Sequence, residues 1–177
     1  MSIDLQQDFF TLFGLPRRFA MDTGALETTY HELHSQVHPD RHAHLADAER
    51  RRAMQWATRV NEAYVTLKTP LSRARYLLEL NGIDAGLETN TAMAPEFLME
   101  QMEWREAVEE AGSGADIDAL DQLHRQLRQQ SKSLLTDLEQ QLDEAGDLDT
   151  AAETVRRLMF LDKLRHEIDH TLEALEN

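Results

Sequence analysis

The feature that most limits how this chain can fold is a set of leucines spaced as on one face of a helix. They are Leu120, Leu123, Leu127, Leu134, Leu138 and Leu142. Apolar side chains at this heptad-like spacing form a stripe that must be buried against other helices. Only 7 glycines and 4 prolines interrupt the 177 residues, and no convincing strand pattern is present. The chain is therefore predicted to be all-α.

The residues from 95 onward predict three helices joined by short connections. Pro95 can open the first helix, and the Gly-Ser-Gly sequence at 112–114 can end it. Asp116 can cap the long leucine-striped helix, and Gly146 marks a turn into a final helix. This final helix carries a second stripe, formed by Val155, Leu158, Leu161, Ile168, Leu172 and Leu175. Short connections favour antiparallel neighbours, so a three-helix antiparallel bundle is expected over 95–177.

The first 76 residues predict a helical hairpin with short flanking helices. Asp8 and Asp22 can each cap a helix, and Pro39 disfavours helical geometry at the residue before it. Thr69-Pro70 can open another helix after the hairpin. The two hairpin helices are expected to pack through matching stripes, formed by Leu26, Tyr30, Leu33 and Val37, and by Ala53, Ala57, Val60, Tyr64 and Leu67.

The charge is distributed unevenly between these two parts. Up to Arg75 the net charge is +1, and over the remainder it is −16. The predicted organisation is a domain at 1–76, the end of a connecting helix and a linker at 77–94, and the bundle at 95–177. The asymmetry indicates two modules with different partners.

Composition excludes several classes of function. The chain has no cysteine, so it offers no thiolate nucleophile or ligand for zinc or an iron–sulfur cluster. No segment approaches the roughly 18 consecutive apolar residues of a membrane span, and the N-terminus lacks a secretory pattern. The net charge of −15 argues against nucleic-acid binding. A cytoplasmic protein with no cofactor is expected.

A short polar loop between the two hairpin helices carries His38-Pro39-Asp40. Proline stiffens such a loop, so its neighbours are displayed at little entropic cost on docking. A Phe-Phe-x-Leu-Phe-Gly-Leu segment and an amphipathic helix precede the tripeptide. A second helix, which ends in Asn61-Glu62-Ala63-Tyr64, follows it. The first 75 residues thus resemble a J domain, the module that docks on a DnaK-class chaperone and stimulates its ATPase. The resemblance implies that His38, Pro39, Asp40 and Arg41 bind the chaperone.

The helix after Pro95 has two apolar faces. At about 100° per residue, one face gathers Phe97, Trp104, Val108 and Ala111, as a bundle core requires. Leu98, Met99 and Met102 point elsewhere, and methionine suits an adaptable binding surface. Phe160 is similarly out of phase on the final helix, so a second, exposed patch is expected. An alternative is that these side chains pack against the J domain or against each other.

Three segments extend the resemblance over nearly the whole chain. They are Phe97-Leu98-Met99-Glu100-Gln101-Met102-Glu103, the stretch from Val155 to Arg165, and the stretch from Pro70 to Leu78. They resemble the HscB co-chaperones of iron–sulfur cluster assembly, in which the J domain engages the chaperone HscA and the bundle binds the scaffold IscU. The resemblance implies no enzymatic activity, and a scaffold-binding set of Leu98, Met99, Met102, Glu103, Arg105, Glu106 and Phe160.

Two alternative functions remain open at this point. A J protein that serves general unfolded clients would need no selective patch on its bundle. The histidines near the tripeptide also have helical spacing, which would suit a zinc protein, although no His-Glu-x-x-His motif is present. This second alternative concerns His31, His34, His38, Asp40, His42 and His44.

Overall fold

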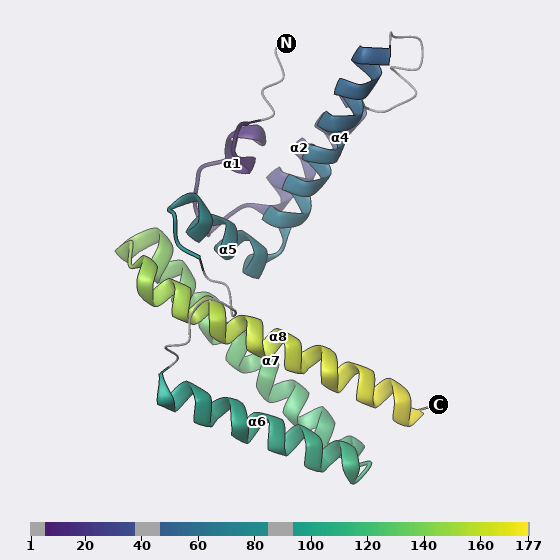
Figure 1. Ribbon diagram of the computed structural model, residues 1–177, viewed down its shortest axis with the longest axis vertical. Coiled ribbons are helices and arrows are strands. Elements are labelled where there is room, and N and C mark those ends of the chain that lie inside the picture. Colours follow the sequence, from purple (N-terminus) through teal and green to yellow (C-terminus); the bar gives the residue numbers. More distant parts are fainter. Residues whose placement is uncertain (1–5, 38–46, 85–93, 177) are drawn as a thin grey trace. The chain divides into compact units, whose positions relative to one another are not determined.

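The computed structural model describes residues 6–37, 47–84 and 94–176, and all regular structure in these ranges is helical (Figure 1). The chain forms two compact units, Met1–Leu77 and Leu78–Asn177. The all-α prediction is confirmed. The elements are α1 (Phe9–Leu12), α2 (Thr23–Val37), α4 (Asp47–Lys68), α5 (Pro70–Leu80), α6 (Pro95–Ser113), α7 (Ile117–Glu139), a π-helical turn η1 (Gln140–Ala145) and α8 (Leu148–Glu176). Across the three described ranges, no helix is both long and apolar enough to span a bilayer.

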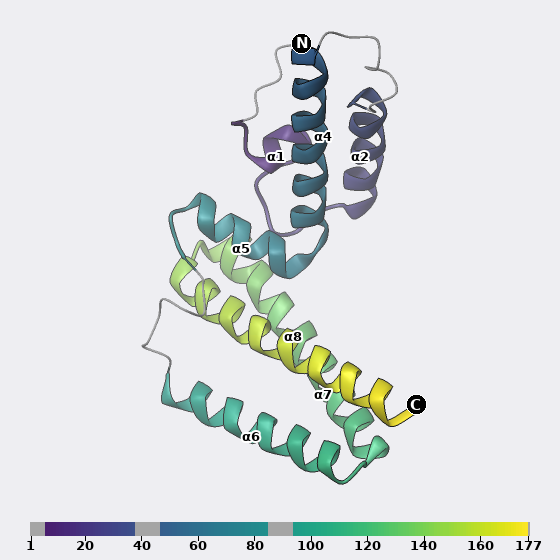
Figure 2. The ribbon, with the colours of Figure 1, turned by 45° about the vertical axis from the view of Figure 1, so that its right-hand side comes forward.

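The first unit is built around the pairing of α2 with α4, which lie side by side, while α1 packs on α4 (Figure 2). Leu26 of α2 and Val60 and Leu67 of α4 are fully buried, as their stripes predict. Trp56 and Ala63 are buried too, whereas the expected Ala53 and Ala57 are only half-buried. The buried face of α4 is thus rotated slightly from the predicted one, because burying the large indole removes more apolar area from water.

Two tyrosines form the half-buried seam between α2 and α4. The rings of Tyr30 and Tyr64 stack with their centroids 4.0 Å apart. The hydroxyl of Tyr30 donates to Oδ1 of Asn61 at 3.0 Å, and Nζ of Lys68 donates to the Tyr64 hydroxyl at 2.9 Å. This seam fixes the angle of the hairpin whose far ends, Val37 and Asp47, flank the His-Pro-Asp segment.

Asp8 caps α1 and is held by two neighbours. Its Oδ1 accepts from the backbone N–H of Thr11 at 3.1 Å, and its Oδ2 accepts from Nη2 of Arg17 at 2.7 Å. Partial burial acts to raise the pKa of this carboxyl, but the hydrogen bonds from Arg17 and Thr11 outweigh it and lower the pKa from 3.8 to about 2. The ionised form of Asp8 therefore stabilises the folded first unit.

Replacing Asp8 by alanine is expected to lower the free energy of unfolding by about 1 kcal/mol at neutral pH. Because the folded pKa is depressed, the contribution of the charge is present above the unfolded value of 3.8 and is lost as the pH falls toward about 2. Urea unfolding of wild type and Asp8→Ala at several pH values should show the gap narrowing below about pH 4. If the difference in unfolding free energy between wild type and Asp8→Ala stayed constant below this pH, the stabilising role of the Asp8 charge would be contradicted. The control is Asp8→Asn, which removes the charge and retains a side-chain oxygen that can cap the helix.

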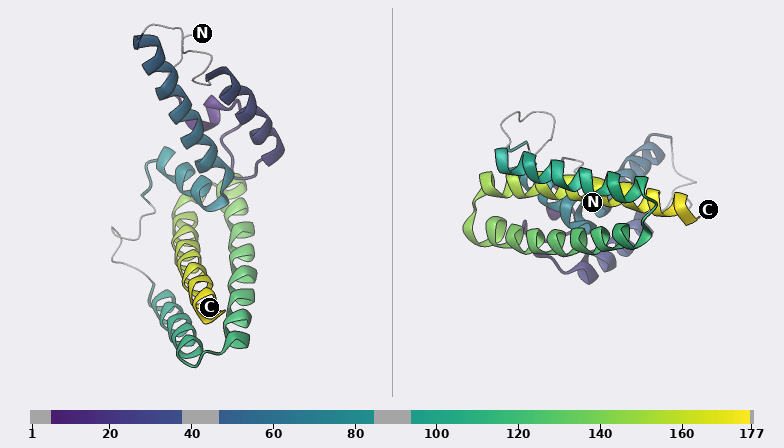
Figure 3. Two further views of the ribbon diagram at one scale, coloured as in Figure 1. Left: turned by 90° about the vertical axis from the view of Figure 1, so that its right-hand side faces the viewer. Right: turned by 90° about the horizontal axis from the view of Figure 1, so that it is seen from below.

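The second unit is a bundle in which α7 and α8 run side by side in opposite directions and α6 packs on both (Figure 3). Asp116 caps α7 by accepting from the N–H of Ala119 at 2.9 Å, as predicted. Leu120, Leu127, Leu134 and Leu138 are buried in the seam. Leu142 is only half-buried, because the π-helical turn changes the helical phase after Leu138. Gly146 then reverses the chain with φ of 66°.

The backbone at Gly146 can be tested against a second glycine of the same bundle. Gly146→Ala is expected to destabilise the bundle by about 1 kcal/mol, since its positive φ disfavours a side chain while no atom lies within 4 Å of the added Cβ. Gly112→Ala is expected to stabilise by roughly 0.5–1 kcal/mol, because Gly112 is helical and its added Cβ would only touch Thr171 at 3.4 Å. Urea unfolding followed by Trp104 fluorescence in a Trp56→Phe background measures the unfolding free energy of both variants. If the two substitutions changed it in the same direction, the backbone conformations assigned to Gly146 and Gly112 would be refuted.

Candidate functional site

The predicted chaperone-binding residues, His38, Pro39, Asp40 and Arg41, lie outside the described residues. The structure describes the helices on either side of them. The two helices are held together by the fully buried Leu26 and Val60 and by the Tyr30–Tyr64 seam. The chaperone-binding site therefore remains a prediction. The structure shows only that α2 and α4, the helices before and after it in the chain, pack against each other.

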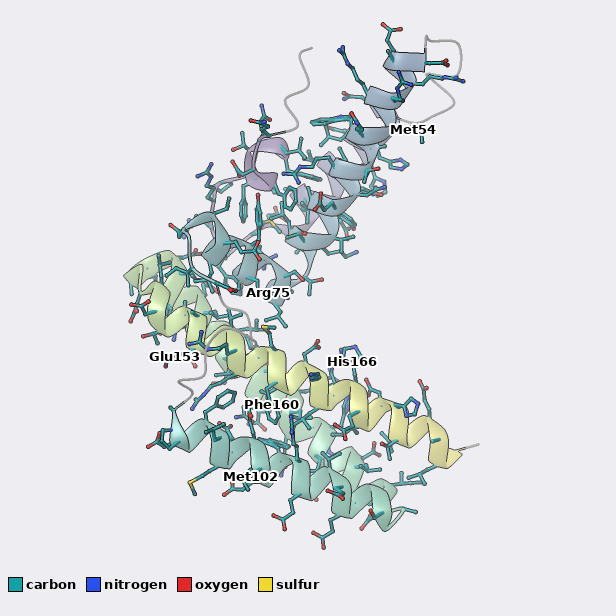
Figure 4. The ribbon with its side chains drawn as sticks, in the orientation of Figure 1. Met54, Arg75, Met102, Glu153, Phe160 and His166 are labelled. Atoms are coloured by element: carbon teal, nitrogen blue, oxygen red, sulfur yellow. The ribbon has the colours of Figure 1, made fainter. Side chains whose placement is uncertain are left out.

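An apolar patch lies on the outer face of α6. Leu98, Met99 and Met102 are 46%, 62% and 71% exposed, although all three are large and apolar. Figure 4 shows Met102 on the side of α6 that faces away from α8. These three residues, called the α6 patch below, lie off the core face as predicted. Phe97, Val108 and Ala111 take the buried positions of α6, and Trp104 is half-buried.

The expectation that Phe160 is exposed is wrong. Its side chain is only 4% exposed and meets the ring of Phe97 edge to face, with the centroids 6.0 Å apart. Figure 4 shows Phe160 on α8. The reason is that α8 buries two faces, one against α7 and a second against α6. A residue out of phase with the leucine stripe is therefore still in the core.

The charged residues predicted beside the patch are exposed on α6. They are Glu103, Arg105 and Glu106. The guanidinium of Arg105 lies 5.8 Å from the centroid of the Phe160 ring, a cation–π distance. The buried Phe160 thus lies within cation–π distance of Arg105, a predicted binding residue. The α6 patch itself is formed by residues of α6 alone.

A polar contact under α6 was missed from the sequence. The carboxylate of Glu100 accepts a hydrogen bond from Nε2 of Gln130 on α7, and its Oε2 lies 3.8 Å from Nη2 of Arg157 on α8. Arg157 also lies over the ring of Phe97 at 5.5 Å. The sequence contains a signal for this contact, because Glu100 lies on the same helical face as Phe97 and Trp104. A carboxylate on a core face needs a hydrogen-bonding or charged partner.

The histidines of α2 lie next to an aromatic side chain. The rings of His31 and His34 each lie 5.5 Å from the ring of Tyr30. Within the part of the chain that the structure describes, no three His, Asp or Glu side chains come together in a way that could hold a metal ion. The other members of the proposed zinc set fall outside that part.

Comparison with known proteins identifies the family. Residues 93–169 match a family model described as the HSCB C-terminal oligomerisation domain. The co-chaperone protein HscB homolog of Azoarcus sp. (strain BH72) is 65% identical over 177 residues, which cover all of both chains. The chain belongs to the HscB co-chaperone family. The HscB homolog of Aromatoleum aromaticum is 63% identical over 176 residues, covering 99% of each chain.

Solved structures of HscB proteins share this fold. Chaperone HscB from Vibrio cholerae aligns with a TM-score of 0.83 and 36% identity, over 96% of this chain and 99% of that one. Human co-chaperone HscB aligns with a TM-score of 0.88 and 30% identity, over 96% of this chain and 84% of that one. The predicted architecture, a J domain followed by a C-terminal helical bundle, is confirmed.

The contrast between the buried and exposed residues predicts different effects on stability. Phe160→Ala is expected to destabilise the bundle by roughly 3–5 kcal/mol, because it leaves a cavity beside Phe97. Met102→Ala should change stability by less than about 0.5 kcal/mol. Urea unfolding followed by Trp104 fluorescence, in the same Trp56→Phe background, compares the two variants. Similar losses for both variants would contradict the assignment of Phe160 to the core.

Proposed function

We propose that this chain binds the iron–sulfur cluster scaffold IscU through the α6 patch and delivers it to the chaperone HscA, whose ATPase it stimulates through its J domain. The observation that carries this proposal is the exposure of Leu98, Met99 and Met102 together on one helix face. Adjacent large apolar side chains exposed to this extent are characteristic of protein-binding surfaces.

The charged rim of the patch supports a protein partner. Glu103, Arg105 and Glu106 are exposed directly after the apolar residues along α6 and add both signs of charge beside them. An apolar centre with a polar rim is the usual arrangement of a protein–protein interface, in which the rim contributes to specificity more than to affinity. Phe160 belongs to this proposal as the support of Arg105 rather than as an exposed contact.

The chaperone arm of the proposal uses His38, Pro39, Asp40 and Arg41. The chain would make and break no covalent bond itself, because hydrolysis takes place in the chaperone. Its contribution is to favour the hydrolysing state of the chaperone by differential binding. Joining the two binding modules in one chain raises the effective concentration of scaffold at the chaperone. The proposed location is the cytoplasm.

One experiment tests both arms with matched controls. Single-turnover ATPase rates of HscA are measured with this protein, and IscU affinity is measured by calorimetry. Asp40→Asn should abolish stimulation and retain scaffold affinity, whereas Asp121→Asn, the same change on the exposed surface of α7, should behave as wild type. Met102→Asp should lower IscU affinity at least tenfold by placing a charge in an apolar interface.

Met54 provides the control for the scaffold arm. It is a 63% exposed methionine on α4, so Met54→Asp makes the same chemical change outside the bundle and should leave IscU affinity as in wild type. Stimulation that survives Asp40→Asn would overturn the chaperone arm. Equal IscU affinity for Met102→Asp and wild type would overturn the scaffold arm.

A further inference from the structure

Beneath the α6 patch, on the opposite side of the helix, lies Glu100. At about 100° per residue, Glu100 falls nearly opposite Leu98 and Met102 around the helix axis. Its side chain is 27% exposed, against 46% and 71% for those two residues. The same turn of α6 thus presents apolar side chains to solvent and a carboxylate to the other two helices.

Glu100 contacts both neighbouring helices at once. It accepts a hydrogen bond from Gln130 of α7 and lies 3.8 Å from the guanidinium of Arg157 of α8. Glu100, Gln130 and Arg157 are called the Glu100 tie below. Within α6, the buried apolar residues lie to either side of this position, with Phe97 before it and Val108 and Ala111 after it.

The tie supplies a kind of constraint that the apolar contacts lack. Hydrophobic burial is non-directional, so the apolar contacts of α6 select which face points inward but define its exact rotation less sharply than directional contacts do. Hydrogen bonds and ion pairs to two different helices depend on direction, and rotation of α6 would break both. The Glu100–Arg157 pair is partly exposed and its atoms lie 3.8 Å apart, so it contributes little to global stability and the principal effect of the tie falls on orientation.

The tie also connects with the rim of the patch. Arg157 lies over the ring of Phe97 at 5.5 Å, and Phe97 meets Phe160 edge to face at 6.0 Å. Arg105 of α6 lies over the ring of Phe160 at 5.8 Å. The contacts of Arg157 therefore extend, through two buried rings, to Arg105, a charged residue on the exposed surface of α6.

We propose that Glu100 and Arg157 are positioning residues that fix the rotation of α6 and so present the α6 patch to its protein partner. This inference rests on the proposed function for the identity of that partner. The rotation itself is a property of the chain alone. Neither residue needs to touch the partner.

The bundle contains a matched control for the tie. Asp169 on α8 also joins two side chains, Arg165 at 3.0 Å and His124 of α7 at 3.4 Å, and it is 39% exposed. This second carboxylate links α7 with α8 and does not involve α6. Asp169→Ala therefore removes a polar contact of the same class without releasing the helix that carries the patch.

The first measurement reports on α6 in the full chain without any partner. Because the chain has no cysteine, Met102→Cys and Lys163→Cys give a unique pair of spin labels on α6 and α8. The label–label distance distribution is expected to be narrow in the wild-type background and to broaden or shift with Glu100→Ala. It should stay narrow with Asp169→Ala. If Glu100→Ala left the label–label distance distribution unaltered, the inference would be overturned, whether or not the scaffold binds this protein.

The second measurement compares affinity for IscU in unlabelled chains. Glu100→Ala is expected to raise the Kd about tenfold, and Asp169→Ala to change it less than about twofold. If Glu100→Ala fails to fold, Glu100→Gln takes its place, because it keeps the volume and an acceptor for Gln130 and loses only the charge attraction to Arg157.

A charge exchange separates positioning from a general loss of packing. Glu100→Arg alone places two cations together, and adding Arg157→Glu restores an ion pair in the reverse sense, with the Gln130 amide able to present its oxygen instead. The double variant should recover most of the lost affinity. Failure of recovery, or equal losses for the Glu100 and Asp169 variants, would overturn the positioning role. Wild type that does not bind IscU would instead overturn the proposed function, with the spin-label result still deciding on the tie.

Discussion

The packing of α7 against α8 is the constraint on which the second unit depends. Leu120, Leu127 and Leu138 fill this seam on the α7 side, and the π-helical turn with Gly146 reverses the chain so that α8 can return along it. The pair offers a two-helix surface that buries one face of α6. Because α7 and α8 cover only one of the two apolar faces of α6, the other face remains outside the core, and there Leu98, Met99 and Met102 are exposed. The exposure of the candidate binding surface therefore depends on the bundle having only two other helices to cover α6, as well as on the apolar residues of α6 itself.

The first unit depends on a similar pairing, between α2 and α4, and the His-Pro-Asp sequence follows directly after the end of α2. Buried Leu26 and Val60 hold the two helices together, and the stacked Tyr30 and Tyr64 cover the seam. The proposed function gives the two pairings one interpretation: each packs helices next to a proposed binding site, and the two sites are proposed to serve different partners. The charge asymmetry between the two halves, +1 against −16, accords with that division.

Much of the fold could be predicted because local signals coincide with tertiary packing. Caps such as Asp8 and Asp116 and the turn at Gly146 lie where the sequence places them, since each satisfies backbone groups by itself. Phe160 could not be placed, because a single helical stripe cannot show that α8 has neighbours on two sides. The position of Glu100 on the core face of α6 indicates that it needs a polar partner, but the sequence does not identify Gln130 and Arg157, which come close to it only in the assembled bundle. The π-helical turn leaves no signal in the leucine spacing, because Leu142 follows Leu138 at a regular interval of four residues and is seen to be half-buried only in the structure.

The one-sided burial of α6 has a consequence for how such a protein can change over generations. Residues that stabilise the helix, such as Phe97 and Val108, are separate from those on its outer surface, such as Met99 and Met102. Substitutions at the exposed positions remove few contacts from the core, so they change the outer surface of α6 with little effect on folding. The chemistry of this outer surface can therefore be altered while the packing of the bundle beneath it is retained.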